Sequence, residues 1–392
     1  MIWNECKTLQ DYIVSMRRDL HKIPELGATL PKTCEYVKTK LDEYGIPYKY
    51  FEEDSCIIAS IKGEKAGKTV ALRADMDALP IKEETGVDYA STHDGCMHAC
   101  GHDAHTSMLL AAAKVLAEHK AELCGEVRLL FQAAEELAKG SPVIVEHGGL
   151  DGVDVVFGTH IGSILGKEIP AGTFIVCPGP VMASYDRFEI KVKGIGCHGS
   201  TPEKGIDPVN IAAHIVTSLQ AISAREFNAC QPNVISIGKI HGGNQYNIIP
   251  DEVVLEGTTR ALNEDVRQKM AKRIGEIAEA TAASFGGSIE YLMDWGAPPV
   301  VNNAEYAAFA AESVKEIFGD KLITSVENPN MGGEDFAVYL NKVPGAFMFL
   351  SSSNPAKNTD IAHHNSKFNI DEDVLWQGSA AFVAITEKFL NE

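Results

Sequence analysis

The segment His93–His105 concentrates side chains that can bind a metal ion. Its sequence, HDGCMHACGHDAH, holds four of the chain's 13 histidines and two of its nine cysteines. Imidazole and thiolate ligands suit a transition-metal cation such as zinc, whereas added carboxylates favour harder ions such as manganese. The segment therefore predicts a metal site. The alternatives are a loop whose histidines bind no metal, and a closed structural zinc site made of Cys96, His98, Cys100 and His102.

Further potential ligands follow three predicted strands, which are TVALRAD (69–75), VRLLFQ (127–132) and VDVVFGTH (153–160). They are Asp75, Asp77, Glu135, Glu136 and His160. Because ligands bind beyond the carboxyl ends of the strands in an open α/β sheet, we expect these side chains to meet the Cys100–His102 loop at one edge. A lone Glu-Glu pair is usually solvated surface. Beside a Cys/His cluster, we interpret the pair as one metal ligand and one general base.

The elements that must position these residues alternate between helix and strand in the first half of the chain. Apolar spacing predicts helices over 8–23, 33–44 and 103–119, and buried apolar runs predict strands over 57–63, 69–75, 127–132 and 153–160. Asp103 is placed to cap the third helix. This alternation predicts an α/β fold with a mostly parallel sheet covered by helices.

The pattern changes near residue 184. Residues 185–194 alternate apolar and polar side chains, as a half-exposed strand does. The segments that follow predict helix, two strands, helix and strand, which is the order of a small ferredoxin-like α+β domain. After Pro298 and Pro299 the chain returns to helix (304–318), strand (345–350) and helix (372–390). We therefore expect a discontinuous metal-binding catalytic domain, residues 1–184 and 297–392, with a domain inserted at 185–296.

Composition limits the partners. The 392 residues include 35 Lys and Arg and 54 Asp and Glu, which gives a formal net charge of −19. Such a charge repels phosphate backbones and anionic lipids, so we expect neither nucleic acid nor a membrane as partner. No apolar run approaches the ~18 residues that a transmembrane helix needs. The nine cysteines are scattered and odd in number, which indicates reduced thiols in the cytoplasm.

Motifs along nearly the whole chain resemble those of the metal-dependent amidohydrolases that include hippurate hydrolase, indole-acetyl-amino-acid hydrolases and N-acetyldiaminopimelate deacetylase. These enzymes belong to a wider clan of aminoacylases and zinc carboxypeptidases. The matching stretches occur in order from residue 17 to residue 373. They are RRDLHKIPELG (17–27), ALRADMDALPI (71–81), HACGHDAHTSMLLAAAKVL (98–116), FQAAEE (131–136), GCHGSTPEKGIDPV (196–209), NIIPDEVVLEGTTR (247–260), MGGEDFA (331–337) and HHNSKFNIDED (363–373).

The resemblance implies two divalent metal ions per subunit, zinc or manganese, with cobalt and nickel as alternatives. The ligands it implies are Cys100, His102, Glu136, His160 and His364. Of the pair His363–His364 we choose His364, because the family's histidine directly precedes a polar–Pro–x–aromatic stretch, here with Ser366 in place of Pro. Glu135 takes the general-base position, and Asp77 matches the aspartate that orients a metal-ligand residue.

The inserted domain resembles the family's dimerisation and lid domain, which implies a homodimer. His198 matches a histidine that reaches an active site, often that of the partner subunit, and steadies the carbonyl oxygen. Asn247 and Arg260 match residues near the substrate carboxylate, and the planar fork of Arg suits that role. The alternatives are an exposed histidine and surface ion pairing.

The resemblance implies hydrolysis of the amide bond of an N-acyl-L-amino acid to a carboxylic acid and a free amino acid. Enzymatic alternatives are a dipeptidase or carboxypeptidase of the same clan, or N-acetyldiaminopimelate deacetylase. Non-enzymatic alternatives are a metal-binding pseudoenzyme, which Glu135 argues against, and a small Cys/His zinc module. Ala133 stands where the family usually has Pro, and Ile161-Gly162 stands where it often has Val-Trp. Both departures fall close to the predicted metal site, so the resemblance does not indicate which acyl group the chain prefers.

Overall fold

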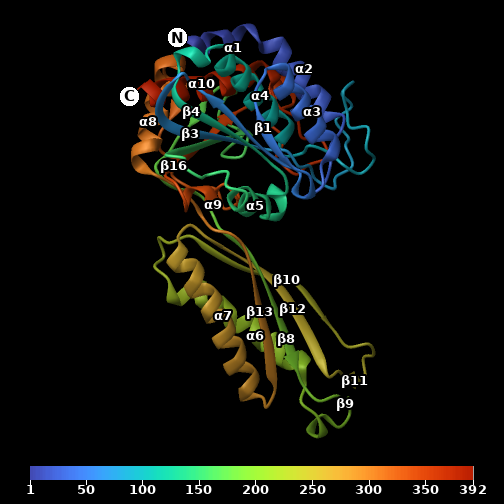
Figure 1. Cartoon of the computed structure of the whole chain (residues 1–392). Coiled ribbons are helices and arrows are strands. Elements are labelled where there is room, and N and C mark those ends of the chain that lie inside the picture. The colour runs from blue at the N-terminus through green and yellow to red at the C-terminus, as the bar shows by residue number, and fades with distance from the viewer. Residues whose placement is uncertain (392) are drawn as a thin grey trace. The chain divides into compact units, whose positions relative to one another are not determined.

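In the computed structural model, which describes residues 1–391, the chain divides into two units (Figure 1). The first unit comprises residues 1–181, 301–330 and the segment from 335 onward. The second unit comprises residues 182–300 and 331–334. The sequence analysis placed the inserted domain at residues 185–296. Two short paired strands, β7 (Gly179–Met182) and β14 (Val300–Asn302), lie where the chain passes from one unit to the other.

The first unit is built on an eight-stranded sheet in the order β1-β2-β4-β3-β5-β16-β6-β15. The central strands β4, β3, β5 and β16 are parallel, which confirms the predicted mostly parallel sheet. β5 is buried along its whole length, as is typical of a strand covered on both faces. The strands are β1 (Tyr48–Phe51), β2 (Cys56–Lys62), β3 (Lys65–Asp75), β4 (Cys124–Gln132), β5 (Val155–Gly162), β6 (Phe174–Ile175), β15 (Leu322–Ile323) and β16 (Gly345–Ser351).

Helix α4 (His102–Glu118) is central to the first unit and packs against β3 and two helices, α2 and α10. Its Ala- and Leu-rich sequence is buried on nearly every side, which suits a helix enclosed between a sheet and other helices. The helix predicted over 103–119 is thereby confirmed. The observed helix begins one residue earlier, at His102, which is a predicted metal ligand. The helices of the unit are α1 (Glu5–Thr8), α2 (Gln10–His21), α3 (Pro31–Glu43), α4, α5 (Gly140–Glu146), α8 (Ala304–Phe318), α9 (Ala337–Leu340) and α10 (Leu375–Asn391).

The second unit is a four-stranded antiparallel sheet, in the order β10-β12-β8-β13, with two helices. This order and the element sequence confirm the predicted ferredoxin-like arrangement. In β8 every second residue is buried, including Phe188, Ile190 and Val192, which form a core with residues of both helices. The elements are β8 (Tyr185–Lys193), α6 (Pro208–Ala221), β10 (Asn233–Gly242), β12 (Glu252–Ala261), α7 (Glu264–Ser284) and β13 (Ser288–Ala297).

A short two-stranded ribbon, β9 (Cys197–His198) with β11 (Ile248–Ile249), also belongs to this unit. Among the helices of residues 1–391, none is both long and apolar enough to span a membrane.

Candidate metal centre

The Cys100 sulfur belongs to two groups of potential metal ligands in the first unit. In each group the ligand atoms all lie within 4.8 Å of one another: Cys100 with His102 and Glu136, and Cys100 with His160 and His363. Cys100 Sγ lies 3.5 Å from His160 Nε2 and 3.8 Å from His363 Nδ1. A thiolate at this position is therefore placed to contact two cations at once.

The alternative zinc site does not form. Within residues 1–391, the groups of three or more close metal donors include neither Cys96 nor His98. Instead, the Cys96 thiol donates to the carbonyl oxygen of Pro24 at 3.3 Å. The Cys/His segment is thus divided, and only its second half faces the carboxyl ends of β3, β4 and β5.

The His102 ring is oriented for a cation. Its Nδ1 donates to the Asp77 carbonyl oxygen at 2.8 Å, so Nε2 is the nitrogen left to bind a cation. Nε2 is buried without a hydrogen bond. Carboxylate oxygens of Asp75, Glu136 and Glu135 lie 3.8, 3.9 and 4.0 Å from it. These spacings are too long for hydrogen bonds and leave room for an ion that contacts both kinds of donor, so the residues fit a divalent metal.

The two glutamates sit on a tight turn, η4 (Glu135–Leu137), directly after β4. Ala134 and Ala138 flank this turn with left-handed φ angles of 55° and 54°. That conformation costs a residue with a Cβ roughly 1–2 kcal/mol. The Asp77 carboxylate accepts hydrogen bonds from the backbone N–H groups of Glu135 (3.1 Å) and Glu136 (3.2 Å). Asp77 therefore holds the strained turn and both carboxylates in place.

His105 is close to the centre but is already satisfied. Its Nδ1 donates to Asp75 Oδ1 at 2.6 Å, and its Nε2 accepts from the backbone N–H of Ile161 at 2.9 Å. Burial alone would raise the pKa of Asp75, but the Arg73 guanidinium, 2.6 Å away, and the nearby histidines hold it well below its ordinary value. Asp75 is thus a permanent anion behind the donor groups, and His105 supports the structure.

Burial sets the protonation of the donors. Together with the Glu136 and Glu135 carboxylates, it raises the pKa of the Cys100 thiol well above its ordinary value. Together with neighbouring imidazoles, it lowers the pKa of His160 well below the ordinary value and that of His363 to about 3. His160 and His363 are therefore neutral lone-pair donors, whereas the thiol needs a nearby cation to ionise. Burial also opposes protonation of His102, but the carboxylates of Asp75, Asp77 and Glu136 raise the pKa of that ring to about 10, so a cation that binds there displaces a proton.

The two adjacent histidines near the C-terminus take different positions. His364, the predicted ligand, places Nε2 3.3 Å from Glu136 Oε1, and its side chain is 53% exposed. His363, which the sequence analysis set aside, packs against His160 with ring centroids 5.0 Å apart. A Cβ atom at Gly162 would lie 2.1 Å from His363 Nε2. The space for this ring therefore depends on a glycine that the sequence analysis recorded only as a departure from the family.

A buried ion network holds the first turn of α4. Arg17 Nε and His21 Nδ1 lie 2.8 and 2.7 Å from Asp103 Oδ2, and His21 Nε2 lies 3.3 Å from Glu83 Oε1. Asp103 was predicted to cap the helix, and that prediction is wrong. The residue before α4 is Gly101, with φ 92° and no side-chain cap. The carboxylate binds α2 instead, because two buried cations offer stronger partners than a backbone amide.

The second unit holds the remaining predicted site residues. His198 is exposed, and its Nδ1 accepts from the backbone N–H of Ser200 at 3.1 Å. Its proton is therefore on Nε2. Asn247 lies directly before the ribbon strand β11, where its carbonyl oxygen accepts from the Gly199 N–H at 2.8 Å. These two predicted residues are brought together.

Arg260 lies elsewhere in the second unit. Its guanidinium donates to the carbonyl oxygen of Thr259 at 2.8 Å and lies 5.8 Å from the centre of the Tyr185 ring. In the β8–β12 pair, Glu252 faces Lys193 at one end and Thr259 faces Asp186 at the other. At ~3.3 Å per residue, Arg260 and the ribbon that carries His198 are separated by about 25 Å along the sheet. The structure does not bring Arg260 together with His198.

Comparison with known proteins identifies the family. The model of peptidase family M20/M25/M40 matches residues 71–388. The chain is 39% identical to thermostable carboxypeptidase 1 of Saccharolobus solfataricus, over 99% of this chain and 98% of that protein. It is also 39% identical to an N-acetyl-L-cysteine deacetylase of Bacillus subtilis, over 95% of this chain and 86% of that protein.

A solved structure agrees with these relatives. The YXEP protein of Bacillus subtilis, described as a dinuclear metal binding peptidase from the M20 family, matches with a TM-score of 0.85 and 35% identity, over 98% of this chain and 99% of that chain. Two donor groups that share Cys100 suit such a pair of divalent ions. The resemblance inferred from the motifs is confirmed: the chain belongs to peptidase family M20/M25/M40 and is a hydrolase that acts on amide bonds.

Proposed function

We propose that the chain hydrolyses N-acyl-L-amino acids to a carboxylic acid and a free amino acid. One observation carries the proposal: the Glu135 carboxylate is buried at 6% exposure beside two donor groups that share one sulfur. A purely structural metal site needs no such base. The deacetylase relative, by its name, acts on N-acetyl-L-cysteine, which belongs to the proposed substrate class.

The proposed ligands are Cys100, His102, Glu136, His160 and His364. His364 is included because its Nε2 lies close to Glu136 Oε1. Metal analysis of two variants, His363→Ala and His364→Ala, would test which of the two histidines is the ligand. We propose zinc or manganese as the native ion, with cobalt and nickel as alternatives, because the set mixes thiolate, imidazole and carboxylate. Such ions, when bound, polarise a carbonyl group and lower the pKa of water toward neutrality.

Glu135 is the proposed general base. Its carboxylate accepts a proton from the attacking water and then passes it to the nitrogen of the leaving amino acid, since amine expulsion needs that proton. Asp77 keeps this carboxylate in position through the turn that it bonds. His198 would donate its Nε2–H to the carbonyl oxygen of the substrate as negative charge develops there. Arg260 and Asn247 are the proposed partners of the substrate carboxylate.

We also propose a homodimer formed through the second unit, which would act as the dimerisation and lid domain. The support is the separation of about 25 Å between Arg260 and the His198–Asn247 ribbon, estimated at ~3.3 Å per residue. One small substrate cannot contact both ends of one rigid sheet. Two chains related by a two-fold axis resolve this, because each ribbon can then serve its partner's site.

The proposed location is the cytoplasm. All nine cysteines are free, and most are buried. Free thiols in this number are typical of a reducing compartment.

A substrate panel tests the function. The metal-loaded enzyme would be given N-acetyl, N-benzoyl and N-indoleacetyl amino acids, N-acetyldiaminopimelate and dipeptides, with zinc, manganese, cobalt or nickel. We expect release of the free amino acid from N-acyl substrates, and none from the Glu135→Gln variant. Turnover of dipeptides alone would support the carboxypeptidase or dipeptidase alternative, and no turnover with any metal would contradict the proposal.

A further inference from the structure

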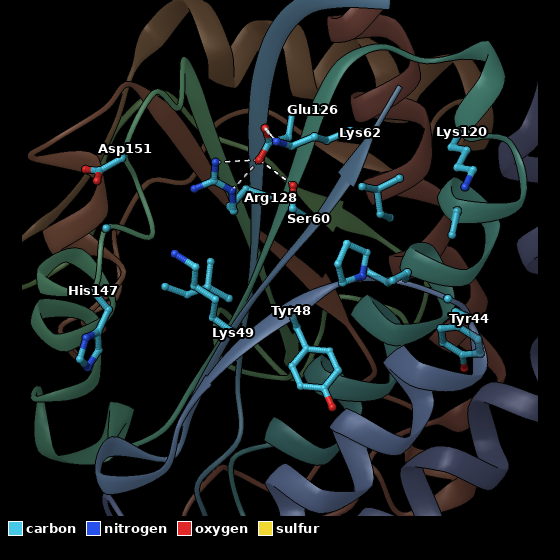
Figure 2. Close-up of a pocket in the computed structure, with 17 residues that line it drawn as sticks. Tyr44, Tyr48, Lys49, Ser60, Lys62, Lys120, Glu126, Arg128, His147 and Asp151 are labelled. Atoms are coloured by element: carbon cyan, nitrogen blue, oxygen red, sulfur yellow. Dashed lines mark hydrogen bonds and ion pairs between the residues drawn. The ribbon is translucent and has the colours of Figure 1, made fainter. Parts of the chain in front are cut away.

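The first unit has a hollow of about 730 Å³ beside strands β1, β2 and β4 (Figure 2). Its lining comes from residues 44–49, 58–62, 117–128 and 147–151, which include neither the proposed metal ligands nor His363. The volume lies within the ~300–1,000 Å³ that is usual for small-molecule sites. The hollow is therefore large enough for a ligand of its own.

Part of the lining is apolar and rigid. Ile46, Ile58 and Ile61 are at most 8% exposed, so they belong to the packed interior and present only a face to the hollow. Tyr44 and Tyr48 also line the hollow, and Figure 2 shows their rings away from the amine of Lys49. Side chains alternate between the two faces along a strand, so Ile58, which pairs with Lys49, lies on the same face as Lys49, whereas Ile61 and Tyr48 lie on the other. Ile58 therefore suits the apolar body of a small molecule bound at Lys49.

The rest of the lining is rich in cations. Lys49, Lys62, Lys120 and Arg128 give four positive charges, and two acids, Glu126 and Asp151, give a local sum of 4 − 2 = +2. The whole chain carries −19. The hollow is thus a positive area on an acidic protein, which favours anionic ligands.

One of the two acids, Glu126, is already hydrogen-bonded to neighbouring side chains. Glu126 Oε1 accepts from the Ser60 hydroxyl at 2.7 Å and from Arg128 Nε and Nη2 at 2.9 and 2.7 Å. Arg128 Nη1 reaches the Gly149 carbonyl oxygen at 3.3 Å, which ties the 147–151 loop to β4. The arginine is therefore held in a fixed position before any ligand arrives, and such preorganisation lowers the cost of binding.

The neighbouring cation, Lys49, is not paired with an acid in this way. Within residues 1–391 Lys49 forms no ion pair, and Figure 2 shows its amine pointing into the hollow, on the side where Arg128 and His147 lie. The His147 ring is itself fixed, because it stacks on Phe51 at 3.8 Å and its Nε2 lies 2.7 Å from Asp54 Oδ2. Lys49 and Arg128 thus form a cationic corner beside Ile58.

We propose that this hollow is a binding site for a small organic carboxylate, with the carboxylate at Lys49 and Arg128 and the alkyl or aryl body on Ile58, which lies on the same face of the strands as both cations. In the described part of the chain the Lys49 ammonium forms no ion pair, whereas the Arg128 guanidinium already donates two hydrogen bonds to Glu126. A carboxylate suits this corner because its single negative charge balances the one remaining positive charge. The proposed ligand class includes the acid that N-acyl amino acid hydrolysis would release. The site does not depend on that reaction, since its residues are outside the metal centre.

Photoaffinity labelling tests the site on the metal-loaded full chain. The probe is benzophenone-4-carboxylate, and labelled peptides are identified by mass spectrometry. We expect labels on peptides that contain residues 44–62, 117–128 or 147–151, with competition by 4-phenylbutyrate and not by the uncharged 4-phenylbutyramide. Labels confined to peptides of the metal centre, or equal competition by the amide, would overturn the proposal.

A charge reversal sharpens the test. Lys49→Glu should reduce labelling of these peptides by at least ~10-fold, because it places a like charge beside the carboxylate. Lys342→Glu reverses an exposed lysine outside the hollow and should leave labelling unchanged. Amide-hydrolase activity should stay normal in both variants, which shows that each is folded. Equal labelling of the two variants would refute the assignment.

Discussion

The metal centre of the first unit and the β9–β11 ribbon of the second present their polar groups in opposite ways. His102 and His160 are 1% and 3% exposed, and their neighbours within a few ångströms are further potential ligands. His198 and Asn247 are exposed, and the hydrogen bond from Ser200 to His198 Nδ1 leaves the proton on Nε2. The grouped donors of the metal centre all come from one chain, whereas the exposed ribbon is the part that we propose to meet a group of the partner subunit.

The largest expected effect is on the buried side of this comparison. Glu135→Gln keeps the shape of the side chain and removes the base, so kcat should fall by at least ~10²-fold. Metal content, measured by elemental analysis, should stay at the wild-type value because Glu136 is intact. Near-normal turnover would remove Glu135 from the mechanism.

The second prediction concerns the shared sulfur. Cys100→Ala should lower the affinity for both ions by at least ~100-fold, since the loss of a direct ligand exceeds the 10–100-fold typical of a supporting residue. His198→Ala should leave metal content unchanged. Equilibrium dialysis with elemental analysis measures both, and a Cys100→Ala protein that retains two ions per chain would contradict the shared role.

The third prediction tests whether the ribbon acts on a partner. Glu135→Gln and His198→Ala should each be nearly inactive, but mixing them with subunit exchange should restore activity. About half of the dimers are then mixed, and each has one intact site of two, so recovery should approach roughly a quarter of wild type. If exchange is demonstrated by mass-tagged chains and activity stays absent, His198 does not serve the partner.

The smallest effect concerns stability. Burial opposes ionisation of Glu83, but bonds from His21, Thr85 and Ser91 lower its pKa to about 2. Because the folded pKa is depressed, this stabilisation is complete above the ordinary value of 4.5 and is lost as the pH falls toward 2. Glu83→Gln should therefore cost at most ~3 kcal/mol at pH 7 and progressively less in acid.

Urea unfolding of the metal-free protein between pH 7 and pH 2.5 measures this difference. Glu203→Gln, an exposed position after the ribbon strand β9, is the matched control and should change stability little at any pH. A pH-independent difference between Glu83→Gln and wild type would rule out the carboxylate as its cause.

Sequence alone predicted the features that depend on local patterns. The long apolar runs gave strands β3, β4 and β5, and the helical spacing of residues 103–119 gave α4. The edge to which these strands deliver Asp77, Glu135 and His160 followed from the geometry of parallel sheets.

Features set by tertiary contacts could not be predicted in this way. Asp103 does not cap α4, because its carboxylate binds Arg17 and His21, which come from a helix about 80 residues earlier in the chain. The separation of Arg260 from His198 depends on the register of β8 with β12, which no spacing along the chain reveals. The position of the His363 ring likewise depends on a strand 200 residues away.

Gly162, the last residue of strand β5, restricts which substitutions the chain can accept, because it lies directly against the His363 ring. With φ at 136° and the place of its missing Cβ filled by His363, it cannot accept a side chain while the imidazole stays. A larger residue there would require the histidine to move or be replaced. Positions 162 and 363 should therefore vary together among related sequences, and a larger residue at position 162 alone should also disturb the metal centre.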